Sequence, residues 1–256
     1  MADPTTSGDP PAVQVIYPQP GPADLVATYQ PTRRRADRWV RLNMITSLDG
    51  ATALAGRSGM LGGSADRAVF QTLRAFADVI LVGAATMRDE HYGPPSLPVD
   101  LRDARLARGQ PAEPTIAVIT RRVELDWDTP FFVAADPKPI VFTVAASASR
   151  IPSDAPVSDV IVAGDDQLDL PAGLDRLAAH GYHDVLVEGG PSINGLLANA
   201  GEIDELCLTL SPQLAGGSSS RILRGATMAA TRLALASVLE AGDFLFLRYC
   251  RPEEGG

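Results

Sequence analysis

The sequence is poor in the residues that bind metals and form disulfides. Its 256 residues include two cysteines, Cys207 and Cys250, and three histidines. It contains neither a Cys-x-x-Cys pair nor a His-x-Glu motif, the spacings that build the zinc site of nucleobase deaminases. Both cysteines lie in strand-like runs, ELCLTL and FLFLRYC, where a small buried thiol is ordinary. These absences exclude deaminase chemistry, and we expect no bound metal.

The sequence also lacks long apolar runs and an excess of positive charge. No apolar stretch approaches the ~18 residues that a membrane span needs. The N-terminal stretch MADPTTSGDPPAVQVIYPQPGP lacks the charged-then-apolar order of a signal peptide. The formal net charge is −9, whereas nucleic-acid-binding proteins usually carry a basic face. We therefore expect a cytoplasmic protein without membrane or nucleic-acid partners.

The composition suits one large globular domain. With 45% hydrophobic residues over 256 positions, the chain can bury a core large enough to fold without metal or disulfide staples. The N-terminal stretch is rich in proline, glycine and small polar residues, and we interpret residues 1–20 as a flexible N-terminal arm. We interpret residues 21–256 as a single domain.

Strand-like and helix-like stretches alternate along the chain. The strand-like runs lie at residues 39–46, 78–82, 115–120, 139–143, 159–164, 184–188, 205–212 and 242–250, and the main helix-like stretches at 64–77, 171–181 and 191–200. Strands separated by helices favour a mainly parallel sheet with helices on both faces. The last strand alternates in polarity, as an antiparallel edge strand does. The sequence therefore predicts an α/β fold: a single three-layer domain with a mostly parallel central sheet and antiparallel edge strands.

The stretch VLVEGGPSINGLL, residues 185–197, places a carboxylate and two glycines at the end of a buried strand. Ligands of open α/β sheets bind beyond the carboxyl ends of the strands, near helix N-termini. Gly189 and Gly190 permit close approach of the backbone to a ligand. Pro191 begins a helix whose amides at residues 192–194 are expected to be free and to form an anion cradle. A pyrophosphate fits such a cradle, and the alternative is an ordinary tight turn.

Glu188 precedes this turn and cannot rest beside a phosphate without repulsion. We therefore expect it to face a second ligand and to accept a hydrogen bond from a ring N–H or an amino group. The alternative is a salt bridge to a nearby arginine. The Pro/Gly-rich stretch HYGPPSLPVD, residues 91–100, is interpreted as a lid or rim of the same site.

Further strand ends carry candidate cofactor contacts. Thr86 follows the buried run DVILVG at a helix start, where a hydroxyl serves as an N-cap or contacts a cofactor. Thr120 and Arg121 end the run IAVIT, and a cation there suits the ribose phosphate that distinguishes NADPH from NADH. Exposed arginines without a role are as common. Val162 and Gly164 end the run DVIVAG and complete this set.

Four segments, taken together, carry a family resemblance. They are NMITSLDGATALAGRSGMLGG (43–63), TLRAFADVILVGAATMRDE (72–90), VLVEGGPSINGLL (185–197) and GEIDELCLTLSPQLAGG (201–217). In this order they resemble the reductase domain of bacterial riboflavin biosynthesis, which has a dihydrofolate-reductase-like fold. The resemblance runs from about residue 38 to the C-terminus. It implies a stand-alone homodimeric reductase that uses NADPH on a ribosylaminopyrimidine phosphate, of the 5-amino-6-(5-phosphoribosylamino)uracil type, and opens its ribose to a ribityl chain.

The resemblance also assigns roles to individual positions. Substrate contacts fall on Ser58, Arg74 and Glu188, and on Asn43, where the family often has lysine. Glu90 stands where the family usually has aspartate. The implied cofactor contacts are Ile45, Met60, Thr86, Glu90, Arg121, Gly190, Pro191, Ser192, Ile193, Asn194, Gly195 and Leu196.

Two departures from the family leave alternatives open. After the Thr86 segment, fused members continue with D-D-P-x-L-x-x-R, whose arginine is positioned for the substrate. This chain reads EHYGPPSLPVDLR and has no arginine at that spacing, so Arg102 and Arg105 are the candidates to replace it. Loss of this arginine relaxes the demand for a ribose phosphate, and the second candidate function is an NADPH-dependent pterin or dihydrofolate reductase. Asn43 in place of lysine motivates the third, an NADPH-binding protein without catalysis.

The expected chemistry is hydride transfer from the nicotinamide to an electrophilic C=N carbon. The protein positions both ligands and excludes water, while the cofactor carries the chemistry. An acid must protonate the developing amine or hydroxyl. Asp49 and Glu188 are the catalytic candidates, and an ordered water is the alternative proton source.

Overall fold

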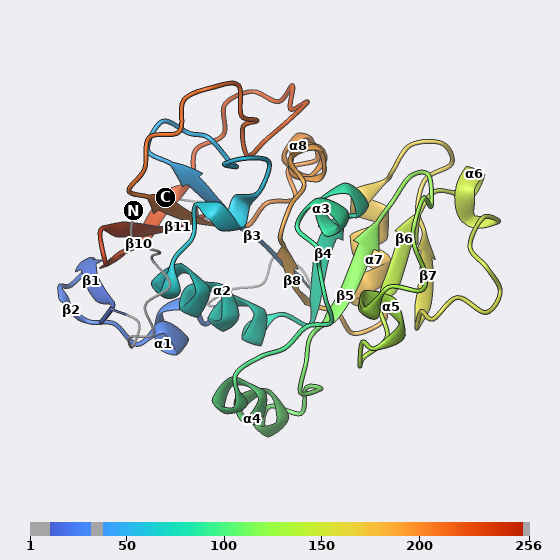
Figure 1. The fold of residues 1–256 in the computed structure, drawn as a ribbon, viewed down its shortest axis with the longest axis horizontal. Coiled ribbons are helices and arrows are strands. Elements are labelled where there is room, and N and C mark those ends of the chain that lie inside the picture. The colour runs from blue at the N-terminus through green and yellow to red at the C-terminus, as the bar shows by residue number, and fades with distance from the viewer. Residues whose placement is uncertain (1–10, 32–37, 253–256) are drawn as a thin grey trace.

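A computed structural model describes residues 11–31 and 38–252 of the chain (Figure 1). Residues 1–10, the first half of the predicted arm, lie outside the described residues. No helix within these two ranges combines the length and the apolar character that crossing a membrane requires.

Strands and helices alternate through the middle of the chain, as the apolar pattern predicts. The strands are β1 (Gln14–Tyr17), β2 (Gly21–Pro22), β3 (Trp39–Ser47), β4 (Val79–Gly83), β5 (Thr115–Ile119), β6 (Ile140–Thr143), β7 (Asp159–Val162), β8 (Asp184–Val187), β9 (Glu205–Ser211), β10 (Ala234–Ala241) and β11 (Phe244–Cys250). The helices are α1 (Leu25–Tyr29), α2 (Ser64–Phe76), α3 (Ala84–Asp89), α4 (Val99–Ala107), α5 (Pro130–Val133), α6 (Ala145–Ala148), α7 (Leu170–Ala179) and α8 (Pro191–Asn199), with a short 3₁₀ helix η1 (Ser58–Met60).

The strands form one sheet in the order β2-β1-β10-β11-β9-β3-β8-β4-β5-β6-β7 (Figure 1). The neighbours from β9 to β7 pair in parallel. The pairs from β9 to β2 are antiparallel. Every residue of β4 and β5 is buried, as expected for parallel strands that are covered on both faces. The predicted sheet, mostly parallel with antiparallel strands at one edge, is confirmed.

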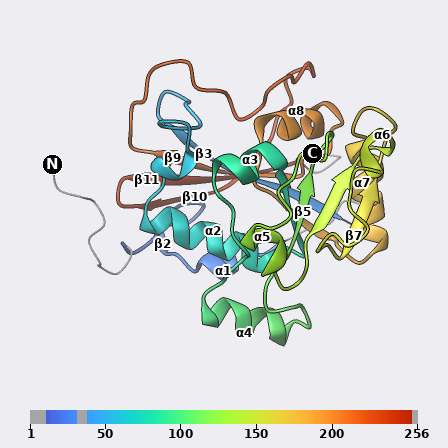
Figure 2. The ribbon, with the colours of Figure 1, turned by 45° about the vertical axis from the view of Figure 1, so that its right-hand side comes forward.

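Two hydrophobic cores separate three layers. On one face, α1, α2, α3 and α5 pack through side chains that include Leu73, Met87 and Phe132. On the other face, α7 and α8 pack through Leu174 and Leu197. Figure 2 shows α1 and α2 on the side of the sheet opposite α8. The three-layer prediction is therefore confirmed.

Part of the predicted arm belongs to the sheet. Gln14 and Val15 of β1 lie opposite Glu240 and Leu239 of β10, and β2 pairs with β1 in turn. The boundary expected at residue 20 thus falls between two paired strands. This pairing depends on β10, a partner more than 200 residues away in the sequence, and the short run QVIY between prolines carries no sign of it.

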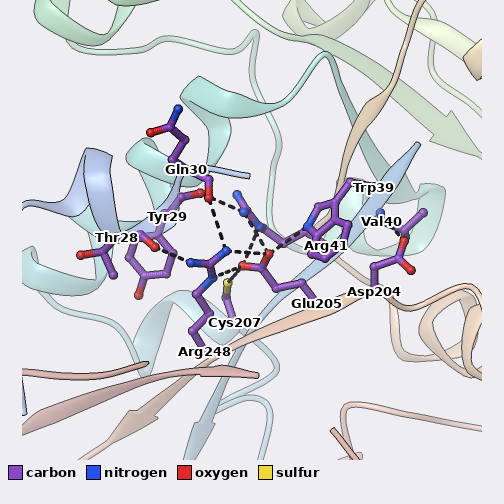
Figure 3. Close-up of polar contacts among 10 residues, drawn as sticks. All are labelled: Thr28, Tyr29, Gln30, Trp39, Val40, Arg41, Asp204, Glu205, Cys207 and Arg248. Atoms are coloured by element: carbon purple, nitrogen blue, oxygen red, sulfur yellow. Dashed lines mark hydrogen bonds and ion pairs between the residues drawn. The ribbon is translucent and has the colours of Figure 1, made fainter. Parts of the chain in front are cut away.

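A buried ion cluster fastens α1 to the sheet (Figure 3). Glu205 has an exposed fraction of 0%. Its carboxylate accepts hydrogen bonds from Trp39 Nε1 at 2.9 Å, Arg41 Nη2 at 3.0 Å and Arg248 Nε at 2.8 Å. The two arginines also donate to the last carbonyls of this segment, those of Thr28, Tyr29 and Gln30. We call this group the Glu205 cluster.

The sequence pattern missed several elements, among them β10 and α4. β10 has the sequence ALASVLEA, whose alanine and leucine residues favour helix over strand, and its strand conformation depends on pairing with β11 and β1. α4 starts inside the stretch interpreted as a lid, and it lies beside α2 at the lower edge of Figure 1. The sequence also suggests Ser64 as the N-cap of α2, but Ser64 is the first residue of this helix, and Gly63 occupies the N-cap position without a side-chain cap.

Candidate active site

The middle of the central strand β3 is partly open to solvent. Asn43 and Ile45 are half-buried, whereas Leu42 before them is buried. They lie in register with Cys207 and Thr209 of β9. Cys207 belongs to the core on the α2 side of the sheet, so Asn43 and Ile45 face that side as well. A ligand can therefore reach the middle of the sheet beside α2.

Glu188 follows the last residue of β8 and, by the β3–β8 register, lies beside Asn43. Its carboxylate accepts a bidentate pair of hydrogen bonds from Arg74 Nε and Nη2, both at 2.7 Å, and a third from the Tyr92 hydroxyl at 2.7 Å. The exposed fractions of the two charged side chains are 2% for Glu188 and 11% for Arg74. The salt bridge to a nearby arginine, the alternative for Glu188, is thus the contact in the structure. We call these residues the Glu188 cluster.

Arg74 is held from several sides yet keeps one donor for a ligand. Its guanidinium carbon lies 4.2 Å from the centre of the Phe70 ring and 5.7 Å from that of Tyr92. Burial acts to lower the pKa of Arg74, but the Glu188 carboxylate outweighs it and raises this pKa. Its hydrogen bonds to Glu188 use Nε and Nη2. The cluster therefore presents a permanently charged donor beside Asn43.

Ser58 and Met60 lie in η1, on the loop between β3 and α2. The Ser58 amide donates to Glu90 Oε1 at 2.7 Å, so Glu90, at the C-cap of α3, joins this loop to the other side of the site. Beside them, Arg57 Nη2 lies 3.0 Å from His91 Nε2. Met60 is 59% exposed. The structure thus gathers η1, α3 and the start of the 91–98 loop at one place.

The turn after β8 lies directly against α3. A Cβ atom on Gly190 would come within 2.8 Å of Thr86 Oγ1, and Gly189 has a φ of +99°. Gly83 N donates to Gly189 O at 3.0 Å. Glycine is therefore required at 190 by close approach and is favoured at 189 by its left-handed backbone. Thr86, a predicted cofactor contact, borders this turn.

The prediction that three free amides form an anion cradle is wrong for two of the three. The amides of Ile193 and Asn194 donate to Gly190 O at 2.9 and 3.1 Å, because the N-cap carbonyl accepts the first bonds of a helix. Pro191 has no amide hydrogen. Within the described residues, the Ser192 amide and hydroxyl are without a protein partner. The anion-binding capacity of this turn is therefore centred on Ser192.

Two residues of the predicted α8 set, Asn194 and Gly195, contact other parts of the protein rather than open space. Asn194 is fully buried, and its Nδ2 donates to Met44 Sδ at 3.1 Å and to Ile222 O at 2.9 Å. A Cβ atom on Gly195 would lie 2.0 Å from Arg224 O. These two residues support a strap formed by residues 218–228, which crosses α8. Ser192 and Leu196 are the exposed members of the set.

Two adjoining cavities extend from α8 to the far strands. The first, of about 570 Å³, is lined by Gly164, Leu196, Asn199 and the 165–171 turn. The second, of about 470 Å³, is lined by three arginines, Arg121, Arg122 and Arg150, together with residues that include Ser147, Asp166 and Gln167. Asp166 and Gln167 border both cavities. This places the predicted positions Gly164, Leu196 and Arg121 along one path.

Two other predicted cofactor positions make internal contacts. Thr120 is 7% exposed, and its Oγ1 accepts a hydrogen bond from Val123 N at 3.0 Å. Val162 is half-buried at the end of β7, where its carbonyl accepts from Arg176. Neither residue lines either of the two cavities.

Asp49, a catalytic candidate, anchors a neighbouring loop. Its carboxylate accepts hydrogen bonds from Ala215 N at 3.0 Å, Gly216 N at 2.7 Å and Ser47 Oγ at 2.5 Å. These donors lower its pKa to about 2. Asp49 is therefore a carboxylate at neutral pH, which argues against its supplying the proton.

The two arginines considered as replacements for the family's substrate arginine lie away from the site. Arg105 is 0% exposed and donates to the carbonyls of Ala75, Ala77 and Pro111. Arg102 lies on α4 and pairs with Glu113 at 3.3 Å. Both hold α4 and its loop against the end of α2. A cation that the structure does place near η1 is Arg57, whose Nη2 lies 3.0 Å from His91 Nε2.

The sequence missed Tyr92, Arg57 and His91 as site residues. Tyr92 and His91 belong to the stretch interpreted as a lid or rim, and the contact between Tyr92 and Glu188 places this stretch at the rim. No periodicity marks a single side chain within a Pro/Gly-rich loop. The stretch HYGPP begins where the sequence departs from the family motif. This departure is the one signal in the sequence that points to His91 and Tyr92.

Comparisons with known proteins agree on one family. Residues 38–246 match the family described as the RibD C-terminal domain. The chain is 31% identical over 189 residues to the 2,5-diamino-6-ribosylamino-4(3H)-pyrimidinone 5′-phosphate reductase of Methanothermobacter thermautotrophicus, covering 72% of this chain and 82% of that protein. It is 31% identical over 173 residues to the riboflavin biosynthesis protein RibD of Mycobacterium tuberculosis, covering 67% of this chain and 41% of that protein.

Solved structures show the same fold. A pyrimidine reductase-like protein from Corynebacterium diphtheriae superposes with a TM-score of 0.78 at 26% identity, covering 91% of this chain and 100% of that chain. Acinetobacter baumannii RibD superposes with a TM-score of 0.68 at 22% identity, covering 84% of this chain and 58% of that chain. The latter likeness concerns the fold alone.

Proposed function

Because this chain belongs to the RibD C-terminal domain family, we propose that it is an NADPH-dependent reductase of a ribosylaminopyrimidine 5′-phosphate in riboflavin biosynthesis. The observation that carries this proposal is the Glu188 cluster beside the half-buried Asn43 and Ile45, within reach of the Gly190 turn. A charged, hydrogen-bonding wall and a close-approach turn thus meet at the middle of a sheet, where an open α/β fold binds its ligands.

The residues present fit a nicotinamide dinucleotide phosphate. Gly190 leaves the space that a Cβ atom would take from Thr86, and the Ser192 amide and hydroxyl lie at the N-terminus of α8, which favours a diphosphate. The cavity with Leu196 and Gly164 would take the adenosine. Arg121, Arg122 and Arg150 in the adjoining cavity favour the additional ribose phosphate, so NADPH is preferred over NADH. The bound cofactor supplies the hydride.

The substrate half of the site is built from β3, α2 and the 57–58 loop. Asn43 and Arg74 Nη1 would bind the polar edge of the pyrimidine, and Glu188 fixes Arg74 for that contact. Ser58 lies next to Arg57, and Arg57 lies 3.0 Å from His91 with no carboxylate between them. The Arg57 guanidinium is a cation beside the Ser58 hydroxyl, and we assign the substrate phosphate to these two groups. Arg57 then replaces the arginine that the family motif supplies.

The contribution of these residues to catalysis is orientation. Holding two reactants face to face can supply ~7–11 kcal/mol of a barrier. Ile45 lies on β3 between Asn43 and the turn at Asp49. It faces the same side of the sheet as Asn43 and would pack against the nicotinamide. Asp49 acts by fixing the 212–217 loop through its hydrogen bonds to Ala215 and Gly216.

We also propose that the protein is a cytoplasmic homodimer. Support comes from the face of β9 and β11 opposite α2, where Leu208 lies beside Leu247 and Leu210 beside Leu245. All four are half-buried, and within the described residues none of them belongs to either hydrophobic core. An apolar surface of this kind suits a self-complementary interface. Sedimentation equilibrium of the full chain should give twice the chain mass, and a monomer at all concentrations would contradict the proposal.

The activity can be tested by following NADPH oxidation. The full chain is mixed with NADPH and either the diaminopyrimidinone named for the archaeal relative or its deaminated uracil counterpart. We expect oxidation that depends on one of these pyrimidines, slower oxidation with NADH, and none with dihydrofolate. Oxidation with dihydrofolate instead would identify a pterin reductase. Tight NADPH binding without oxidation in any mixture would identify a binding protein and contradict the proposal.

A further inference from the structure

Arg57 is an exposed cation on a tight turn between β3 and η1. Its amide donates to Leu54 O at 2.9 Å, and Leu54 N donates back to Arg57 O at 3.0 Å. These bonds fix the backbone of Arg57 but not its side chain, and an exposed side chain loses rotamer freedom when it pairs with a charged ligand. A contact that holds the guanidinium in advance would therefore strengthen the binding of a phosphate.

His91 makes such a contact. Its Nε2 lies 3.0 Å from Arg57 Nη2, and its other ring nitrogen, Nδ1, lies 2.8 Å from Arg88 O. A carbonyl oxygen only accepts hydrogen bonds, so Nδ1 must carry a hydrogen. A guanidinium only donates, so Nε2 must present a lone pair to Arg57. The two contacts together therefore select the neutral ring of His91 with its hydrogen on Nδ1.

The backbone of His91 has an uncommon conformation at this point. His91 follows Glu90, the C-cap of α3, and its φ is +54°. Few residues other than glycine adopt this left-handed region, and they persist there where the surrounding structure holds them. Glu90 Oε1 accepts a hydrogen bond from Ser58 N at 2.7 Å. The segments 57–58 and 90–91 are thus joined by two contacts, which hold the His91 ring beside Arg57.

The next residue, Tyr92, belongs to the Glu188 cluster. Its hydroxyl donates to Glu188 Oε2 at 2.7 Å, and the same carboxylate accepts from Arg74. Consecutive residues of one loop therefore contact both ends of the substrate half of the site, His91 at Arg57 and Tyr92 at the cluster of Arg74. Because consecutive Cα atoms are ~3.8 Å apart, this loop fixes the spacing between the two ends.

The two arginines have partners of different charge. Arg74 is paired with the Glu188 carboxylate at 2.7 Å, which offsets its positive charge and suits the uncharged edge of a pyrimidine. The His91 ring that contacts Arg57 is neutral, so the positive charge of Arg57 is not offset by this partner. A carboxylate in the place of this ring would repel a phosphate. The charges therefore favour one orientation of the substrate, with its ring at Arg74 and its phosphate at Arg57.

We propose that His91 is a positioning residue for the substrate phosphate, an inference that rests on the proposed reductase function. Its Nε2 accepts a hydrogen bond from one of the five N–H donors of Arg57 and holds the guanidinium in place. Other donors of the same guanidinium bind phosphate oxygens, which arginine can contact in pairs. His91 acts through Arg57, so its removal should weaken binding of the phosphorylated substrate without slowing hydride transfer.

The test measures NADPH oxidation with two substrates, the ribosylaminopyrimidine 5′-phosphate and the same compound without its phosphate. Arg57→Gln should raise KM for the phosphorylated substrate by about 10- to 150-fold, the usual loss of a hydrogen bond to a charged group. His91→Phe should raise this KM by about 5-fold. His91→Gln, whose amide oxygen can accept from Arg57, should stay near wild type. In all three variants kcat, and KM for the substrate without phosphate, should stay near wild type.

His180→Phe is the matched control. His180 is an exposed residue at the C-cap of α7, and its Nδ1 lies 2.7 Å from Arg176 O, a contact like that of His91 Nδ1. Its substitution should change KM for neither substrate. The double variant Arg57→Gln/His91→Phe should bind the phosphorylated substrate no more weakly than Arg57→Gln alone. An additive loss in the double variant, or an equal rise of KM for both substrates in His91→Phe, would overturn the proposal.

A readout without catalysis tests the hydrogen bonds of the ring. In protein carrying ¹⁵N-labelled histidine, the ring resonances that vanish in His91→Phe should show a hydrogen on Nδ1 and none on Nε2 at neutral pH. A hydrogen on Nε2 would overturn the proposal. Equal KM values of the wild-type chain with and without the phosphate would overturn the assignment of the phosphate to Arg57, and the role of His91 with it. Absence of oxidation with either compound would instead overturn the reductase function on which both rest.

Discussion

Two buried glutamates, one on each side of β3, accept hydrogen bonds from the same kinds of group, arginine and an aromatic side chain, in different surroundings. Glu205, at the start of β9, is fully enclosed, and its donors Arg41, Arg248 and Trp39 are themselves buried. Glu188, at the end of β8, is paired with Arg74 and with Tyr92 from a loop, beside strand residues that solvent can reach. A carboxylate–guanidinium pair therefore says little about role by itself. A structural cluster is enclosed on every side, whereas a binding site keeps one side of the cluster open to a ligand.

The largest effect should come from breaking the enclosed cluster. Glu205→Gln leaves Arg41 and Arg248 without a counter-charge in the interior, and removing one partner of a buried ion pair costs about 3–5 kcal/mol. Urea unfolding should show a loss of this size. The exposed Glu124→Gln, whose carboxylate lies 3.9 Å from Arg122, serves as the control and should change stability by less than about 0.5 kcal/mol. A Glu205→Gln variant as stable as this control would contradict the structural role.

The same cluster should govern stability in acid. Burial alone would raise the pKa of Glu205, but Arg41 and Arg248 outweigh it and hold the pKa below its ordinary value of 4.5. A carboxyl with a lowered folded-state pKa contributes stability that is present above 4.5 and is lost as pH falls through the folded-state pKa. Wild-type stability should therefore drop more steeply below pH 4.5 than that of Glu205→Gln. Parallel curves for the two proteins would show that Glu205 is not the group responsible.

Breaking the open cluster should affect turnover more than folding. Glu188→Gln keeps the shape of the side chain but weakens its hold on Arg74, and a hydrogen bond to a charged group contributes about 1.5–3 kcal/mol. We expect kcat/KM for the pyrimidine to fall by about 10- to 150-fold, with NADPH affinity near wild type. Steady-state kinetics and a fluorescence titration measure the two quantities. Unchanged kinetics, or a loss confined to NADPH binding, would argue against a substrate role.

The smallest effect should come from substituting Tyr92, the loop residue of the Glu188 cluster. Tyr92→Phe removes one hydrogen bond to Glu188 and keeps the ring over Arg74, so the expected loss is about 1 kcal/mol, or about 5-fold in kcat/KM. Thermal stability should change little. If Tyr92→Phe instead destabilised the chain as much as Glu205→Gln, the Glu188 cluster would be as structural as its counterpart.

The sequence predicted the frame of the fold and singled out one of the two glutamates. β4, β5 and β8 are apolar runs, because both faces of these strands are covered, and the sequence pattern detects them. Glu188 was found because it precedes two glycines at a strand end. Glu205 was taken as part of a strand, since its partners Arg41 and Arg248 lie 164 and 43 residues away and no local pattern links them.

Other residues could not be placed from the sequence because their environment is tertiary. An aspartate in the first turn of a helix, such as Asp66, is explained locally by the helix dipole. The burial that raises the pKa of this carboxyl comes from tertiary packing, which no local pattern shows. The prediction of free amides at Ile193 and Asn194 is wrong for a local reason. The carbonyl of the N-cap residue, Gly190, accepts a hydrogen bond from each of them.

Transfer of an isotope tests the central claim most directly, that the open side of the Glu188 cluster is where a cofactor reduces the sugar carbon of a pyrimidine. NADPH carrying deuterium at the transferring position of C4 is incubated with the wild-type chain and the ribosylaminopyrimidine phosphate, and the product is examined by mass spectrometry and NMR. One deuterium at C1′ of a ribityl chain is the predicted result. A product without deuterium, or NADPH oxidation that is independent of the pyrimidine, would contradict the account.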